Sequence, residues 1–160
     1  MSRIRWRDAM VVDRGLIDED HRHLIDIINR FGDEGSRGRG GLAVAVDVLH
    51  ALQFYAETHF EREEQLQRLV NYPEQALHHD EHRRLTATLD DMIAKAGSIT
   101  DDGASVVQEV SALLSHWLLD HVIKMDLRMK PYGALMSQHA SGLPELRAVA
   151  RNPRVSVPSR

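Results

Sequence analysis

The sequence predicts an all-α protein, an antiparallel, up-down-up-down four-helix bundle with an N-terminal arm and a C-terminal extension. Apolar residues recur at steps of three and four along several stretches, as they do on the buried face of a helix. We find no alternating run of β-branched residues bounded by turns, the pattern that would indicate a strand. With 160 residues, the chain is long enough to bury one hydrophobic core without disulfides.

Turn residues divide the chain into four helices. A glycine-rich loop over 32–41 follows the first helix, and Pro73 separates the second helix from the third. A turn over 97–103 precedes the fourth helix, which we expect Pro131 to end. Short connections of this kind imply antiparallel neighbours. The expected helices are Glu19–Phe31, Leu42–Val70, Glu74–Ala96 and Ala104–Met129.

Segments at both ends lie outside the predicted bundle. We expect one domain over residues 1–132, with an arm over 1–18 and the bundle over 19–132. Residues 133–160 form the C-terminal extension, which contains several prolines. A short helix over Leu143–Ala150 is expected there, followed by ten poorly ordered residues.

Composition narrows the chemistry that is open to the chain. The absence of cysteine excludes disulfides, iron–sulfur clusters and thiolate zinc sites, so any metal must have nitrogen and oxygen ligands. A net charge of −4, with acids and bases interspersed, differs from the basic surface of nucleic-acid-binding proteins. No apolar run is long enough for a signal peptide or a membrane span. We therefore expect a cytoplasmic protein with neither nucleic acid nor membrane as a partner.

Histidine occurs ten times, and the positions of these residues are more informative than their number. On each expected helix, polar residues share the three- and four-residue steps of the core leucines. A polar group buried without a partner costs roughly 1–3 kcal/mol, a cost that a shared metal site would remove. The polar residues on these stripes are His21, His59, Glu63, His78, His82 and His121.

Each of these residues also has an ordinary explanation. A single histidine on an apolar face is usually only hydrogen-bonded, and Glu63 lies in a charged run typical of a solvated surface. Chance placement would nevertheless have to put five histidines at similar depth on four helices. Asp126 follows His121 by five residues, an awkward step for an α-helix, so spacing alone does not select it. The remaining histidines fall off the stripes or in the tail and are expected on the surface: His23, His50, His79, His116 and His139.

Taken in order, these motifs resemble the bacterial hemerythrins, relatives of invertebrate hemerythrin and of the four-helix bundle myohemerythrin. The resemblance covers the chain from Trp6 to Tyr132. Its segments are Ile17-Asp18-Glu19-Asp20-His21-Arg22-His23-Leu24, His59-Phe60-Glu61-Arg62-Glu63-Glu64, Tyr72-Pro73 with His78 and His82, and Trp117-Leu118-Leu119-Asp120-His121 with Asp126 and Lys130-Pro131-Tyr132.

The resemblance implies two iron ions joined by two carboxylates and an oxo or hydroxo group. One iron would have three histidine ligands and the other two. By this resemblance the ligands are His78, His82 and His121 on the first iron, His21 and His59 on the second, and Glu63 and Asp126 on both.

Two of these ligands are assigned from the resemblance as well as from the spacing of residues along the helices. His23 is a rival for His21, but His21 stands three residues before Leu24, as the family's histidine does before its leucine, and it shares the helical stripe. The five-residue offset of Asp126 from His121 is likewise the spacing of the family.

The resemblance implies reversible binding of dioxygen, for storage, delivery or sensing, with no enzymatic activity beyond a weak oxidase or peroxidase reaction. The iron with two histidines would be short of a ligand, so dioxygen would bind there. Apolar neighbours would keep the pocket small and dry. The candidates by position are Leu24, Phe60, Trp117, Leu118 and Val122. The sequence does not indicate a protein partner.

Two other classes of protein fit the same ligands. A di-iron enzyme acting on peroxide, oxygen or nitric oxide would need a wider pocket and a second substrate. A structural bundle would bind zinc or no metal, because nitrogen and oxygen ligands also admit manganese, cobalt and zinc. Turnover with an electron donor would indicate the enzyme, and metal analysis of untagged protein would indicate the structural bundle.

Overall fold

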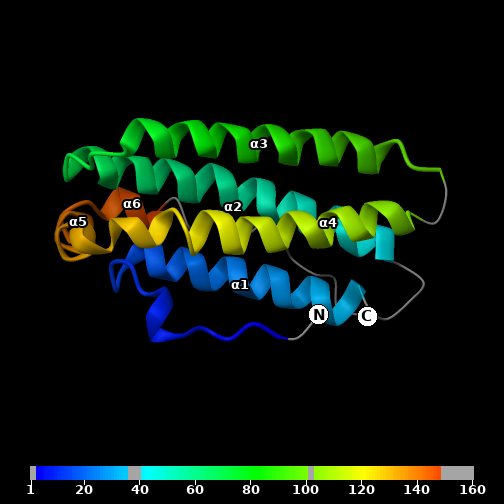
Figure 1. Cartoon of the computed structure of the whole chain (residues 1–160), viewed down its shortest axis with the longest axis horizontal. Helices are drawn as coiled ribbons and strands as arrows, with labels where there is room; N and C mark the ends of the chain where they lie inside the picture. Colours follow the sequence, from blue (N-terminus) through cyan, green and yellow to red (C-terminus); the bar gives the residue numbers. More distant parts are fainter. Residues whose placement is uncertain (1–2, 36–40, 101–102, 149–160) are drawn as a thin grey trace.

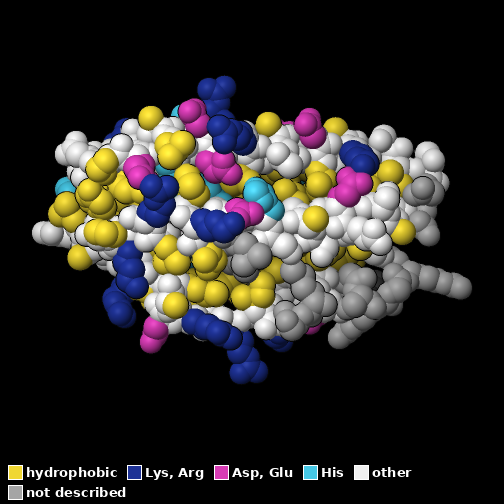
Figure 2. Space-filling model, in the orientation of Figure 1, with side chains coloured by type: hydrophobic (Ala, Val, Ile, Leu, Met, Phe, Trp, Pro, Cys, Tyr) yellow, Lys and Arg dark blue, Asp and Glu magenta, His cyan; other side chains and the backbone are white. Residues whose placement is uncertain are grey.

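The computed structural model describes residues 3–35, 41–100 and 103–148. Within these ranges every regular element is helical, and no strand occurs. None of the described helices combines the length and apolar composition that crossing a bilayer requires. On the face shown in Figure 2, acidic and basic side chains are interspersed, and hydrophobic side chains gather at the end of the bundle where α5 lies.

Four helices form the body of the protein: α1 (Leu16–Gly35), α2 (Gly41–Leu69), α3 (Gln75–Gly97) and α4 (Ala104–His116). They lie along the long axis of the molecule and alternate in direction (Figure 1). Helix α2 contacts each of the other three, and α1 also contacts α4. The predicted up-down-up-down bundle is confirmed.

Helix α1 is longer than predicted at both ends. It begins at Leu16 rather than Glu19 because the Asp13 carboxylate accepts hydrogen bonds from the free N–H groups that precede and open the helix. The donors are Gly15, Ile17 and Asp18, at 2.8, 3.1 and 3.1 Å. Gly32 does not end the helix. A glycine inside a helix costs about 1 kcal/mol, but burial of Phe31 in the same turn stabilises the helix by about 1.5–3 kcal/mol and outweighs that cost.

The fourth predicted helix is interrupted. After α4 the chain forms a π-helical segment, η2 (Trp117–Val122), and then a 3₁₀-helix, η3 (Asp126–Tyr132). The prediction that Pro131 stops the helix is wrong, because η3 continues through it. A 3₁₀ segment tolerates this proline, whose fixed φ of about −65° suits the helix.

Two short helices at the end of the described chain pack against the bundle. They are α5 (Gly133–Ser141), which the sequence did not predict, and α6 (Pro144–Ala148), which lies within the short helix expected over Leu143–Ala150. Their buried residues join a hydrophobic cluster with the start of α1 and the end of α2. The ten residues expected to be poorly ordered lie outside the described ranges.

The core consists of two hydrophobic clusters with a polar layer between them. The larger one includes Leu24, Phe60 and Trp117, and the smaller one, next to α5, includes Ile17 and Leu66. The apolar stripes that the three- and four-residue steps predict are buried along all four helices. The exceptions are two methionines on the third and fourth stripes, Met92 and Met125, which are half-buried. Along each of the four chain segments, the polar residues of this layer lie between residues of the larger cluster and residues of the smaller one.

The N-terminal arm is attached along α1. The backbone of Ile4 exchanges two hydrogen bonds with the Asn29 side chain, at 2.7 and 2.8 Å. The Arg22 guanidinium lies 4.4 Å from the centre of the Trp6 ring, a cation–π contact. The arm therefore covers one side of α1 as well as leading into it.

We expect Gly133→Ala to destabilise the protein. A methyl group on Gly133 would meet the Val12 carbonyl oxygen at 1.9 Å, so the arm and the start of α5 would have to separate. Overpacking of this kind typically costs 1–3 kcal/mol, and about 1 kcal/mol corresponds to roughly 2–4 °C in the unfolding temperature. Thermal unfolding followed by circular dichroism measures the loss. The control is Gly142→Ala, whose methyl would lie 3.5 Å from the carbonyl oxygen of His139, an ordinary contact distance. Equal unfolding temperatures for the two variants would contradict the prediction.

Candidate metal centre

All seven side chains that the sequence singled out lie in the polar layer, with exposed fractions of 0–2%. They come from every long segment of the bundle. His21 lies on α1, His59 and Glu63 on α2, His78 and His82 on α3, His121 in η2, and Asp126 at the start of η3.

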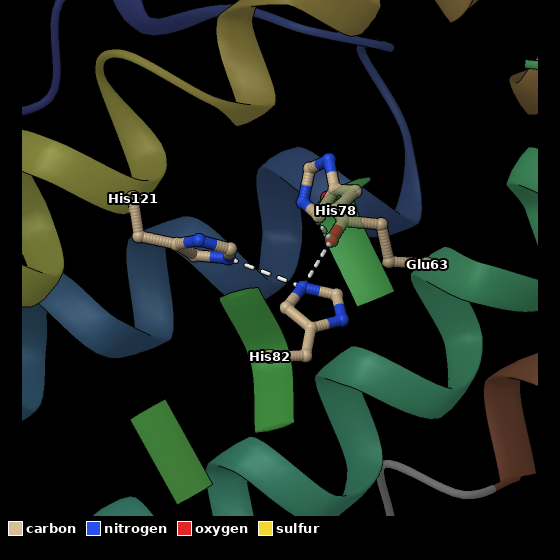
Figure 3. Close-up of side chains that lie close together, drawn as sticks. All are labelled: Glu63, His78, His82 and His121. Atoms are coloured by element: carbon tan, nitrogen blue, oxygen red, sulfur yellow. Dashed lines mark hydrogen bonds and ion pairs between the residues drawn. The ribbon is translucent and has the colours of Figure 1, made fainter. Parts of the chain in front are cut away.

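One group of four converges on a single point: Glu63, His78, His82 and His121 (Figure 3). Their ligand atoms all lie within 4.8 Å of one another. His82 Nε2 lies 3.0 Å from Glu63 Oε2 and 3.2 Å from His121 Nε2. His78 Nε2 lies 3.1 Å from the same glutamate oxygen.

A second group shares Glu63 with the first and adds His21, His59 and Asp126, again within 4.8 Å. His21 Nε2 lies 3.0 Å from Asp126 Oδ2, and His59 Nε2 lies 3.9 Å from Glu63 Oε2. The other oxygen of Asp126 reaches the first group, at 3.0 Å from His78 Nε2. Both carboxylates therefore lie between the two groups of histidines.

Two of the histidines have their outer nitrogens hydrogen-bonded to carboxylates. His82 donates its Nδ1–H to Glu64, 2.7 Å away, and His59 donates its Nδ1–H to Asp20, 3.2 Å away. A neutral imidazole that donates through Nδ1 has a lone pair on Nε2. In that form Nε2 of both rings points towards Glu63 Oε2, where the lone pairs and the carboxylate oxygen could share a cation.

The spacing and the unpaired atoms fit a metal. Donor atoms about 2.1 Å from one ion, at right angles to each other, lie about 3 Å apart. Glu63 Oε2 lies at such distances from His78 Nε2 and His82 Nε2, 3.1 and 3.0 Å. Both oxygens of Glu63 and of Asp126 are buried without a hydrogen bond, as are Nε2 of His21, His59 and His78. Since buried polar groups normally have partners, these residues fit bound cations.

The charges of the metal-free cluster also favour cations. Burial alone would raise the pKa of Glu63, but the surrounding histidines lower it well below its usual range. The pKa of Asp126 is lowered as well, because His121, His21 and His78 outweigh burial and the Glu63 charge. Burial lowers the pKa of His121 to about 4. Two ionised carboxylates and a neutral imidazole are therefore already in place.

Four of the predicted pocket residues lie on one side of the seven polar side chains. Leu24, Phe60, Trp117 and Val122 are buried in the larger hydrophobic cluster. The Phe60 ring stacks on His82, with 3.8 Å between ring centres, and lies 5.7 Å from Trp117. The side chain of Leu118 lies outside the described part of the structure.

Sequence reasoning missed the residues behind the ligands. Asp20 and Glu64 hold the outer nitrogens of His59 and His82, and the Tyr55 ring stacks on His59 at 4.9 Å. The charged neighbours of His21 and Glu63 in the sequence were the available signal for Asp20 and Glu64. Periodicity placed Tyr55 in the core but did not indicate its contact with a ligand.

The other histidines lie outside the cluster. His23, His50, His79 and His116 are exposed, as predicted, and His139 is half-buried. His23, the rival of His21, belongs to neither of the two metal-binding groups.

Comparison with known proteins agrees with the geometry. Residues 13–132 match the family model described as the hemerythrin HHE cation binding domain. The chain belongs to the hemerythrin family. As a hemerythrin, it is a non-haem di-iron binding protein, and the two groups of ligands fit that cofactor. The resemblance predicted from the sequence is confirmed.

This hemerythrin is similar in sequence to several bacteriohemerythrins. The one from Methylococcus capsulatus is 30% identical over 141 residues, which cover 86% of this chain and 99% of the relative. The one from Pseudomonas aeruginosa is 26% identical over 122 residues, or 76% of each chain. The one from Clostridium acetobutylicum is 26% identical over 124 residues, or 76% and 94%.

We expect the metal-free hemerythrin to lose stability as the pH rises from about 6.5 towards 10. Burial would lower the pKa of His78, but Glu63 and Asp126 raise it to about 10. A group whose pKa is higher in the folded state stabilises the fold fully below its unfolded pKa, about 6.5 here. That contribution disappears as the pH passes through about 10.

Urea unfolding of metal-free protein at pH 6, 8 and 10 measures this loss. His78→Gln is expected to flatten the dependence, whereas His79→Gln, at the exposed neighbouring position, is expected to retain it. A metal-free protein as stable at pH 10 as at pH 6 would contradict the prediction.

Proposed function

We propose that the protein binds dioxygen reversibly at a di-iron centre, for oxygen storage, delivery or sensing. The observation that carries the proposal is the pair of buried ligand groups that share Glu63. The proposed ligands are His78, His82 and His121 for one iron, His21 and His59 for the other, and Glu63 and Asp126 as bridges together with an oxo or hydroxo group.

The unequal number of histidines supports dioxygen binding at one of the two ions. An ion held by His21 and His59 would have one histidine ligand fewer than one held by His78, His82 and His121, which would leave a position open for dioxygen. Iron(II) with an open position supplies the reversible binding of dioxygen. The protein holds the His59 and His82 rings in place before any metal binds, because each ring donates a hydrogen bond to a carboxylate.

The apolar residues around the site keep water away from it. Leu24, Phe60, Trp117 and Val122 are buried against the cluster, and we propose that they line the oxygen pocket with Leu118. A dry, apolar wall would favour an uncharged diatomic ligand over anions and water.

The proportion of ligand types favours binding over oxidation. Ferritin-like di-iron proteins use a carboxylate-rich set, whereas the cluster here has five imidazoles and two carboxylates. Fewer anionic ligands stabilise oxidised iron less. We place the function in the cytoplasm, where a reducing environment keeps iron divalent.

Reversible oxygenation is the direct test of this function. We expect protein that has been loaded with iron and reduced under nitrogen to gain a visible absorption band on addition of oxygen. The band is expected to disappear when the gas is removed and to return over several cycles. Turnover of peroxide or nitric oxide with a donor, without a reversible band, would support the enzyme alternative instead.

His21→Ala is expected to abolish this reversible band, because it removes one of two histidines from the ion with the open position. His23→Ala changes the same residue type two positions away and is expected to behave as the unmodified protein, since His23 is exposed. Iron content per chain and the oxygenation spectrum measure both. Loss of the band in His23→Ala with retention in His21→Ala would reverse the assignment.

A further inference from the structure

The C-terminal helix α6 is joined to the interior of the bundle by one buried side chain. Arg62 of α2 donates its Nε–H to the carbonyl oxygen of Leu146 at 2.8 Å. Leu146 is 2% exposed and packs with Leu16 and Ile17 at the start of α1. The carbonyl lies at the end of α6, where it has no partner within the helix.

The same arginine continues to the metal centre. One terminal nitrogen of Arg62 pairs with Asp20 Oδ2, the oxygen that accepts the Nδ1–H of His59 at 3.2 Å. His59 Nε2 then faces Glu63. A continuous series of contacts therefore runs from the Leu146 carbonyl through Arg62 and Asp20 to His59.

Little else in the described structure compensates the Arg62 charge. Its side chain is 1% exposed, and its remaining terminal nitrogen is buried without a hydrogen bond. Without α6, the arginine would lose the acceptor at Nε, and water would reach the buried guanidinium that pairs with the Asp20 carboxylate. The orientation of the His59 ring depends on that carboxylate.

We propose that Arg62 and Asp20 are positioning residues through which docked α6 holds His59 towards the metals. The family-model match ends at Tyr132, so the helix that completes this link lies beyond the matched domain. The proposal rests on the proposed function, because it concerns a ligand of the ion that would bind dioxygen. Its consequence is that the C-terminal extension tunes one iron and leaves the other unaffected.

The test compares the release of the two irons. Protein loaded with iron(II) under nitrogen is mixed with the ferrous chelator ferrozine, and the absorbance follows iron release. In Arg62→Met, and in a chain ending at Ser141, we expect one iron to leave about 10–100-fold faster, the range typical for loss of a group behind a metal ligand. The second iron is expected to leave at the unmodified rate. Asp20→Asn gives a third variant if either of these fails to fold.

Arg147→Met is the matched control. It makes the same change on α6 itself, where Arg147 is exposed and lies 3.8 Å from Glu19, and we expect no effect on either iron. Acceleration of both irons together in Arg62→Met would indicate general loosening and overturn the proposal, as would unchanged rates.

A second measurement needs no iron. Nitrogen-15 spectra of the metal-free protein report which ring nitrogen of His59 carries the proton, and we expect Nδ1 in the unmodified protein and a mixture in Arg62→Met. Identical spectra would overturn the proposal. Failure of the unmodified protein to hold two irons would instead count against the proposed function.

Discussion

The structure depends on two buried carboxylates held between five histidines in an otherwise apolar core. Burying an isolated charge is costly, and a carboxylate without partners would usually take up a proton. Here the histidines keep Glu63 and Asp126 ionised, so the cluster is a preformed site for cations. The ligands come from α1, α2, α3 and the segment η2–η3 after α4, which means that the bundle must assemble completely before the charges are compensated.

The break in the fourth helix is what completes this cluster. In a regular α-helix, a residue five positions after His121 would lie well off the face that carries His121. The π-helical segment η2 and the change to 3₁₀ geometry at η3 alter the rotation per residue, and Asp126 becomes as deeply buried as His121. A departure from ideal helical geometry thus coincides with the functional site, as π-bulges often do.

The described part of the N-terminal arm and the helices α5 and α6 enclose the site without contributing any of the seven ligands. The arm meets α5 at Gly133, where the backbones are too close for any larger residue, and α6 supplies the carbonyl that Arg62 requires. Both features close the bundle beside the smaller hydrophobic cluster. With the larger cluster on the other side, the polar layer is shielded from water in both directions along the bundle.

The sequence by itself determined the class of the fold, the first three helices to within four residues, the start of the fourth, and six of the seven clustered side chains. This was possible because burial on a helix repeats every three or four residues, so a histidine such as His59 reveals its direction through its neighbours. Asp126 needed the family's spacing, since periodicity assumes a regular helix. Only the tertiary structure decided α5, the oxygens behind His59 and His82, and the link from Arg62 to Leu146. These contacts join residues up to 84 positions apart, and no local pattern encodes which distant segments will meet.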